Sequence, residues 1–170
     1  GLKITKIVGE SLPLDVKKNV AGSAAEAMLK AHPQKAGFEI EIYKNIKAGS
    51  GIGSSAASAA GAVFGINELL GKPFTAHELI AFAMEGEALA SGSAHADNVA
   101  PVLMGGITLV RSINPIDVIQ LPTPKELTAV ILHPKIELKT MHAREIIKKN
   151  VTMEKAIQQW GNLGAFVSAL

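Results

Sequence analysis

Apolar and polar residues alternate most regularly over the segment Phe38–Tyr43, which reads FEIEIY. Apolar residues occupy every second position there and glutamates separate them, which is the period of a strand with one buried face. The residues that follow, 44–53, are interrupted by glycine and predict a loop.

Helical periodicity predicts further elements on both sides of this strand, over the ranges 19–30, 54–70 and 75–90. The first helix is expected to follow Asn19, because helix formers with one apolar face come after it. Gly71 is a stop signal for the second. The third has Thr75 and Glu78 at the spacing of a capping box.

In the second half of the chain the pattern predicts strands at 106–111 and 127–133, and helices at 143–149 and 153–170. The strand at 127–133 is apolar nearly throughout and is therefore expected in the centre of a sheet. The stretch 113–124 between the strands contains three prolines, so a surface connection is expected there.

Composition supports a packed globule and argues against several kinds of partner. Of the 170 residues 48% are hydrophobic, and the formal net charge of +2 is scattered along the chain, so no nucleic-acid or membrane surface is indicated. The absence of cysteine excludes disulfides and is typical of a reducing compartment, so a cytoplasmic location is expected. No secretory signal is recognisable, and the small-residue stretch 52–70 is too polar for a membrane span.

The segment 47–57, which reads KAGSGIGSSAA, places three glycines at alternate positions directly before a predicted helix. Glycine permits positive φ and close approach to an anion, and the N–H groups of a first helical turn attract phosphate. Ser54 and Ser55 can cap the helix, and a hydroxyl there can also reach a phosphate oxygen or a magnesium ion. The loop is therefore a candidate phosphate site.

A flexible turn, a Walker loop and a dinucleotide fingerprint are three other interpretations of this loop. A flexible turn before a serine-capped helix remains open. A Walker loop requires a lysine before its final Ser or Thr, and none stands there. Gly51, Gly53 and Ala56 fit a dinucleotide fingerprint, but the predicted strand ends near Tyr43, too early for the tight turn of that fingerprint.

Residues 85–98, which read EGEALASGSAHADN, concentrate carboxylates, an imidazole and an amide at the end of a predicted helix. Magnesium-assisted phosphoryl transfer needs a carboxylate at the cation and groups that orient the attacking hydroxyl. Glu87 is a candidate for the first task. His95, Asp97 and Asn98 are candidates for the second. A polar, capped helix end is the other interpretation, and the spacing matches no zinc site.

The glycine loop resembles the phosphate-binding motif of the GHMP kinases, P-x-G-x-G-L-G-S-S-A-A. Lys47 replaces the usual proline and Ile52 the usual leucine, and neither change removes a donor to phosphate. The resemblance implies ATP as the phosphoryl donor and Mg²⁺ held by Ser55 and Glu87. It further implies an ATP-binding set made of Asn19, Lys47, Ala48, Gly49, Ser50, Gly51, Ile52, Gly53, Ser54 and Ser55. Asn19 matches a position near the adenine, and a simple helix cap is the alternative.

Within this superfamily, residues 87–106 resemble homoserine kinases, through EALASGSAHADNVAP followed by two glycines. The resemblance implies phosphorylation of the L-homoserine hydroxyl to O-phospho-L-homoserine, a step of threonine biosynthesis. It implies substrate contacts from His95, Asp97, Asn98, Thr140 and Arg144. Asn98, Glu87 and Arg144 are the implied catalytic residues, with Asn98 near the accepting hydroxyl and Arg144 on the amino-acid carboxylate.

The resemblance also implies an α+β class with the GHMP-kinase fold. A ribosomal protein S5 domain 2-like N-terminal domain, which binds ATP, is expected over residues 1–112, and the start of a ferredoxin-like C-terminal domain over residues 113–170. The first strands of the former and most of the latter are expected to lie outside this chain. The family further suggests a homodimer.

Two other functions remain open from the sequence. One is a GHMP kinase with another alcohol acceptor, such as mevalonate or a sugar. The other is a noncatalytic GHMP-like domain that binds nucleotide without turnover. Glu87, His95, Asp97 and Arg144 argue against the second, because a binding module has no need of both halves of a transfer site. Asp97 is the only candidate for a general base.

Overall fold

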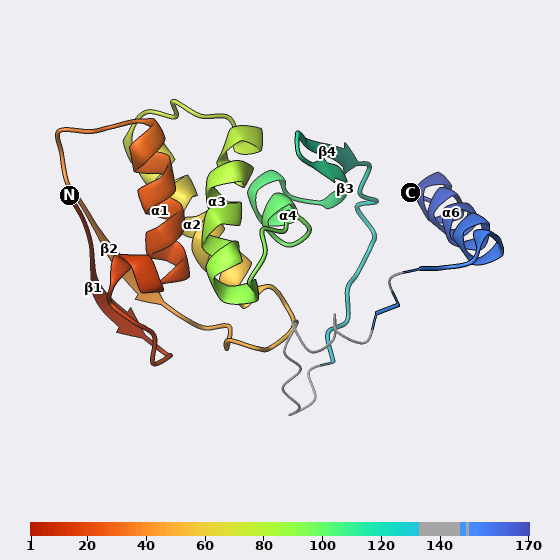
Figure 1. Cartoon of the computed structure of the whole chain (residues 1–170), viewed down its shortest axis with the longest axis horizontal. Helices are drawn as coiled ribbons and strands as arrows, with labels where there is room; N and C mark the ends of the chain where they lie inside the picture. Colours follow the sequence, from red (N-terminus) through yellow and green to blue (C-terminus); the bar gives the residue numbers. More distant parts are fainter. Residues whose placement is uncertain (133–146, 149) are drawn as a thin grey trace.

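The computed structural model describes residues 1–132, 147–148 and 150–170. Its elements in chain order are β1 (Leu2–Val8), η1 (Val16–Lys18), α1 (Val20–Ala31), β2 (Phe38–Tyr43), α2 (Ser54–Leu69), α3 (Ala76–Ser91), α4 (Val99–Met104), β3 (Ile107–Ile113), β4 (Ile116–Leu121) and α6 (Met153–Ser168). Figure 1 shows the strands β1 and β2 on one side of helices α1–α3 and the strands β3 and β4 on the other.

Strands β1 and β2 form a parallel pair. Leu2 lies opposite Phe38 at one end of the pair, and Val8 lies opposite Tyr43 at the other. Strand β2 has the bounds that the alternation predicted, and its side chains alternate between half-buried and exposed. Strand β1 was not predicted. Its register shifts just after Ile4, and this irregularity coincides with a break in the alternation of apolar residues.

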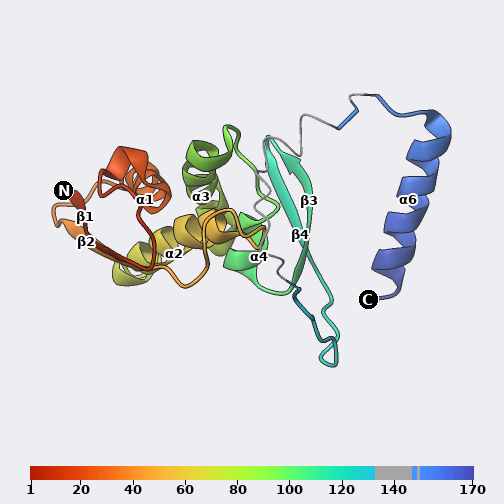
Figure 2. The same ribbon diagram turned by 90° about the horizontal axis from the view of Figure 1, so that it is seen from below.

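Helices α1, α2 and α3 contact one another and enclose the core (Figure 2). All three confirm the predicted helices to within a residue or two at their ends. Alanines fill most of the helix contacts, and the largest fully buried side chains are those of Met28, Leu79, Ile80, Val63 and Val99. Small residues at the contacts allow the helix backbones to approach closely.

The capping box predicted at the start of α3 is confirmed. The N–H and Oγ1 of Thr75 both donate to Glu78 Oε2 at 2.8 Å, and Glu78 N–H donates to Thr75 Oγ1 at 3.3 Å. The backbone hydrogen bond, followed by the side-chain one, lowers the pKa of Glu78. A carboxylate in the first turn also suits the positive end of the helix dipole.

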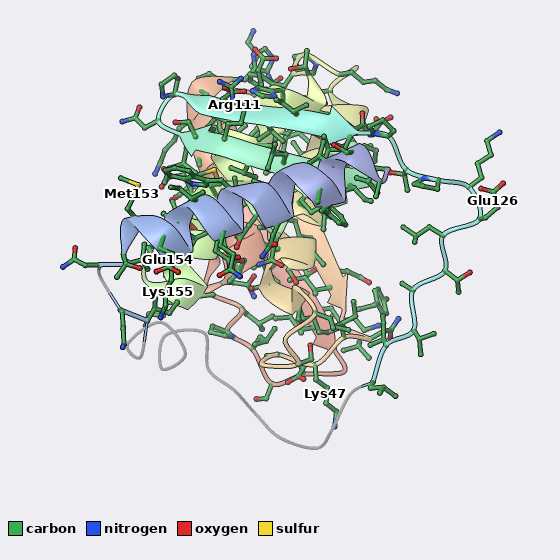
Figure 3. All side chains as sticks on the ribbon, turned by 90° about the vertical axis from the view of Figure 1, so that its right-hand side faces the viewer. Lys47, Arg111, Glu126, Met153, Glu154 and Lys155 are labelled. Carbon is green, nitrogen blue, oxygen red and sulfur yellow. The ribbon has the colours of Figure 1, made fainter. Side chains whose placement is uncertain are left out.

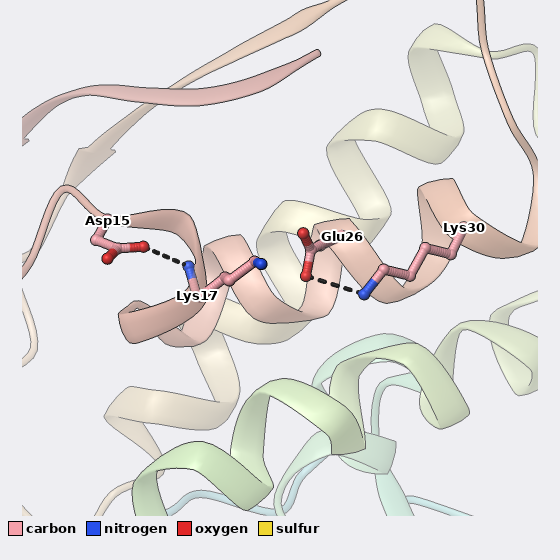
Figure 4. A network of polar contacts seen from close by, with 4 residues as sticks. All are labelled: Asp15, Lys17, Glu26 and Lys30. Atoms are coloured by element: carbon pink, nitrogen blue, oxygen red, sulfur yellow. Dashed lines mark hydrogen bonds and ion pairs between the residues drawn. The ribbon is translucent and has the colours of Figure 1, made fainter.

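Two polar contacts lie on the outer surface of η1 and α1 (Figure 4). Asp15 Oδ1 accepts a hydrogen bond of 2.9 Å from Lys17 N–H and caps η1. Lys30 pairs with Glu26 one helical turn earlier, at 3.1 Å. Exposed pairs of this kind add little stability, so packing against α2 and α3 accounts for the position of α1.

Strands β3 and β4 form an antiparallel hairpin, so the prediction of a surface connection over residues 113–124 is wrong for its central part. Ile113 lies opposite Ile116 next to the turn. The prolines lie in the turn and beyond the end of β4, where they interrupt no ladder hydrogen bond. An ion pair of 3.3 Å joins Arg111 and Asp117 across the hairpin; Figure 3 labels Arg111 on this hairpin.

The short helix α4 was also missed by the pattern analysis. It follows Asn98 directly and packs against α2 and α3. Pro101 lies in its first turn, where proline is tolerated because those N–H groups have no intrahelical partner. Gly105 and Gly106, both with positive φ, end the helix and lead into β3.

The strand predicted over 127–133 is wrong for residues 127–132, which have no regular secondary structure. Val130 is 84% exposed and Leu132 is 88% exposed. A strand requires a neighbouring strand to satisfy its backbone groups, and among the described residues none pairs with this segment. Residue 133 and the helix predicted over 143–149 fall outside the described residues, apart from residues 147 and 148.

Helix α6 confirms the last predicted helix, and Thr152 caps it by accepting from Lys155 N–H. Ala156, Trp160, Leu163 and Val167 lie at helical spacing along α6, but α6 contains no buried residue, and Trp160 is 64% exposed. Figures 1 and 2 both show α6 apart from helices α1–α3. Within the described part of the chain, no helix is long and apolar enough to cross a membrane.

Candidate active site

A cavity of about 460 Å³ lies where the glycine loop, the start of α1 and the end of α3 meet. Most residues of the predicted site line it, namely Asn19, Ala48, Gly49, Ser50, Gly51, Gly53, Ser54, Ser55, Glu87 and Asn98. Segments far apart in the sequence therefore contribute to one hollow.

The glycine loop joins the end of β2 to the first turn of α2. Gly49, Gly51 and Gly53 have φ of 72°, 78° and 75°, in the left-handed region that other residues rarely adopt. Strand β2 ends at Tyr43 and α2 begins only at Ser54. This long connection confirms that the loop is not the tight turn of a dinucleotide fingerprint.

The two serines at the start of α2 do not cap it, so that part of the prediction is wrong. Gly53 is the N-cap residue and provides no side-chain hydrogen bond. Ser54 Oγ instead donates to Ile46 O at 2.6 Å, and Ser55 Oγ donates to Glu87 Oε1 at 3.1 Å. No side-chain cap therefore uses the first-turn N–H groups of α2, which are donors of the kind that bind anions.

Glu87 reaches the start of α2 from the last turns of α3. Its side chain is largely buried, with 8% of the residue exposed, and it accepts the hydrogen bond from Ser55. A carboxylate and a hydroxyl are oxygen donors of the kind that Mg²⁺ prefers. Within the described ranges, no group of three or more acidic, histidine or cysteine side chains is placed so that it could hold a metal ion. Phosphate oxygens and water would have to complete the shell of a cation here.

The connection from α3 to α4 carries the other predicted polar residues. Asn98 lines the cavity, and its Oδ1 lies 3.5 Å from the position that a Cβ on Gly53 would take. His95 Nε2 is 2.6 Å from Ser93 Oγ, and Asp97 Oδ1 accepts from Asn98 N–H at 3.1 Å. The structure thus brings Asn98 to the loop and leaves His95 and Asp97 on the adjoining connection, off the cavity wall.

Residues 19–106 match the family described as "GHMP kinases N terminal domain", which is just over half of the chain. The chain belongs to the GHMP kinases. The fold class expected from the loop motif is therefore confirmed, with the N-terminal domain of that family present.

This GHMP kinase chain is similar to proteins named homoserine kinase. That of Chloroherpeton thalassium is 47% identical, over 98% of this chain and 55% of its own length. That of Methanococcus vannielii is 40% identical, over 100% of this chain and 56% of its own. The crystal structure of homoserine kinase from Cytophaga hutchinsonii superimposes with a TM-score of 0.93 at 48% identity, over 100% of this chain and 55% of that one. The chain spans about half the length of the relatives it matches.

Asn19 caps helix α1 of this GHMP kinase and also lines the cavity. Its Oδ1 accepts from Ala21 N–H at 3.0 Å and from Gly22 N–H at 3.5 Å, which caps α1. Its Nδ2 donates to Pro13 O at 2.8 Å. The residue is buried and also borders the cavity, so a cap and a place beside a ligand do not exclude each other.

Two of the predicted ATP-binding residues, Lys47 and Ile52, are exposed and do not line the cavity of this GHMP kinase. Figure 3 shows the Lys47 side chain at the outer edge of the molecule. Thr140 and Arg144 lie outside the described residues.

Lys44, which no sequence pattern singled out, also lines the cavity of this GHMP kinase. Its Nζ donates to Ser54 O and to Ser58 Oγ, both at the start of α2. Burial lowers the pKa of Lys44, while the negative charges of Glu10 and Glu87 oppose that shift. The signal available in the sequence was a lysine placed directly between an amphipathic strand and the glycine loop.

Proposed function

We propose that the protein containing this chain transfers the γ-phosphoryl group of ATP to the side-chain hydroxyl of L-homoserine, forming O-phospho-L-homoserine in threonine biosynthesis. The cavity that joins the glycine loop, the Ser55–Glu87 pair and Asn98 carries this proposal. The relatives named homoserine kinase, at 40% and 47% identity, support the choice of acceptor.

The loop and the start of α2 are proposed to bind the phosphates of ATP. Backbone N–H groups at a helix N-terminus provide donors and a favourable dipole for anions. Asn19 borders the part of the cavity formed by Leu12, Pro13 and Val20, whose apolar surface suits the nucleoside. Lys47 and Ile52 do not line the cavity, but both belong to the loop and are proposed as further contacts with ATP.

Ser55 and Glu87 are proposed to hold Mg²⁺, because their oxygens lie 3.1 Å apart at the phosphate end of the cavity. When bound there, the cation would neutralise charge on the β- and γ-phosphates. Glu87 belongs to α3 and Ser55 to α2, so two helices would set the position of the bound cation.

The acceptor is proposed to bind beside Asn98, with its hydroxyl near this amide. His95, Asp97, Thr140 and Arg144 complete the proposed substrate set, and Arg144 is proposed to pair with the amino-acid carboxylate. Holding the hydroxyl in line with the γ-phosphorus can lower the barrier by about 7–11 kcal/mol. Positioning then contributes more than a general base.

The organisation of the whole protein is part of the proposal. Residues 1–112 are proposed as the ATP-binding N-terminal domain and residues 113–170 as the start of the C-terminal domain, although β3 (Ile107–Ile113) runs across this boundary. A homodimer in the cytoplasm, with small molecules as its ligands, is proposed from the family.

Release of ADP by the full-length protein tests the acceptor. With Mg-ATP and homoserine, mevalonate or galactose supplied separately, we expect ADP only with homoserine. Turnover with mevalonate alone or galactose alone would overturn the choice of substrate. ATP binding without turnover on any of the three would indicate a noncatalytic domain.

Replacing Lys44 by methionine is expected to weaken ATP binding about tenfold, the loss of one charge-assisted hydrogen bond to phosphate. Calorimetric titration of ATP measures the effect.

The affinity for ATP is also expected to depend on pH through Lys44. Because burial lowers the pKa of Lys44, its ammonium loses the proton at a lower pH than an exposed lysine does. The affinity for ATP should therefore fall as pH rises through that pKa.

The Ser58→Ala variant is the control for Lys44, since it removes one of the lysine's hydrogen-bond partners and keeps the positive charge. It should bind ATP nearly as well as the wild type. If both variants lost the same affinity for ATP, Lys44 would act by holding α2 in place and not by neutralising phosphate.

A further inference from the structure

The glycine loop is anchored firmly at its inner end, where it enters α2. Ser54 Oγ is bonded to Ile46 O, and Ser55 Oγ to Glu87. The stretch before it contains the positive-φ residues Gly49 and Gly51. Glycine loses more conformational freedom on ordering than any other residue, so fixing this stretch around a ligand costs entropy unless something already restrains it.

The outer end of the loop is restrained by Glu10. Ala48 N–H donates to Glu10 Oε1 at 3.3 Å, across 38 positions of sequence. Glu10 is half-buried and belongs to the segment 9–13 between β1 and η1. Leu12 and Pro13 of this segment line the same cavity as the loop. The hydrogen bond therefore joins two walls of the cavity.

The segment 9–13 is itself fixed at both ends. A Cβ on Gly9 would lie 2.2 Å from Lys44 O, so the backbone of Gly9 rests directly on that carbonyl. At the other end, Pro13 O accepts the hydrogen bond of 2.8 Å from Asn19 Nδ2. Glu10 therefore belongs to a short segment that cannot shift without breaking these contacts.

We propose that Glu10 is a positioning residue, whose carboxylate holds the outer limb of the loop at Ala48 in the shape that receives the phosphates of ATP. It acts through the loop backbone and does not touch the nucleotide. The proposal rests on the proposed use of this loop for ATP. Neither the loop motif nor the polar cluster at 85–98 includes Glu10.

The charge of Glu10 has a second effect, which the experiment must separate from the first. Its attraction favours the charged form of Lys44 and so opposes the lowering of that pKa by burial. Glutamine keeps an acceptor oxygen for the Ala48 N–H and removes the charge, whereas alanine removes both. Comparing the two variants therefore separates the hydrogen bond from the charge.

The test is calorimetric titration of the protein with Mg-ATP, with triphosphate alone and with adenosine, at neutral pH. In the Glu10→Ala variant we expect ATP and triphosphate to bind about three- to tenfold more weakly, the loss of one net hydrogen bond. Glu10→Gln should restore both affinities to within about twofold of the wild type. Adenosine should bind all forms equally. The matched control is Glu39→Ala, which removes an exposed carboxylate from β2.

Unchanged or tighter ATP binding by Glu10→Ala would overturn the proposal, and so would a Glu10→Gln variant as weak as Glu10→Ala. A parallel loss of adenosine affinity would also overturn it, since a general distortion of the cavity would then explain the result. If the wild type binds neither ATP nor triphosphate, the phosphate site itself is wrong, and that failure is visible without any variant.

Discussion

Replacing Glu87 by alanine is expected to abolish homoserine-dependent ADP release, with kcat reduced by at least about a hundredfold. Glu87 is the buried carboxylate of the cavity, and its Oε1 lies 3.1 Å from Ser55 Oγ at the start of α2. Without this carboxylate, the proposed Mg²⁺ site loses a ligand, and the charge that develops on the phosphates is no longer neutralised there. Steady-state assays of the full-length protein measure the effect.

The control for this experiment is Glu85→Ala, because Glu85 is an exposed carboxylate two positions earlier on the same helix. It should keep wild-type turnover. Thermal unfolding of both variants checks that α3 remains folded. If Glu87→Ala folded normally and kept turnover within a few-fold of the wild type, Glu87 would have no place at the cation.

Replacing Gly86 by alanine is expected to destabilise the protein by about 1–3 kcal/mol, the usual cost of overpacking a core. A Cβ at this position would lie 2.4 Å from Val20 O, 2.9 Å from Ala24 Cβ and 3.1 Å from Ala59 Cβ. The nearest of these atoms belongs to the backbone of α1, so no side-chain rotation relieves the clash. Helix α3 must move away from both neighbours, and Glu87 moves with it.

Urea unfolding compares this variant with Gly61→Ala, a matched substitution on α2. Nothing lies within 4 Å of a Cβ at Gly61, so alanine there should stabilise the helix by about 0.5–1 kcal/mol. The two substitutions should thus shift the unfolding midpoint in opposite directions with little change in m-value. A midpoint for Gly86→Ala at or above that of the wild type would show that the helices separate freely at this contact.

Elements with strong local signals were predicted well from the sequence. The alternation in β2 and the capping box of α3 depend on neighbouring residues alone, and both were confirmed. The hairpin strand β4 was missed because prolines flank it closely. The apolar run at 127–132 was assigned to a strand because periodicity describes what a segment could bury and says nothing about whether a partner strand is present.

The candidate site divides in the same way. By itself the sequence identified the glycine loop as a candidate phosphate site, because its glycines and the helix that follows are adjacent in the chain and their chemistry is local. It also pointed to Glu87 and Asn98 as polar residues near a helix end, and only the family resemblance paired Glu87 with Ser55 of the loop.

Only the tertiary structure decided which residues share the cavity. Lys44 lines the cavity, and Glu10 accepts a hydrogen bond from the loop at Ala48. His95 and Asp97 lie beside the cavity, and the hydroxyls of Ser54 and Ser55 donate to Ile46 and Glu87 instead of capping α2. The physical reason is that side chains distant in sequence meet through helix packing. The close approach of α1, α2 and α3 at Gly86 is set by the shapes of all three helices together, which no local pattern contains.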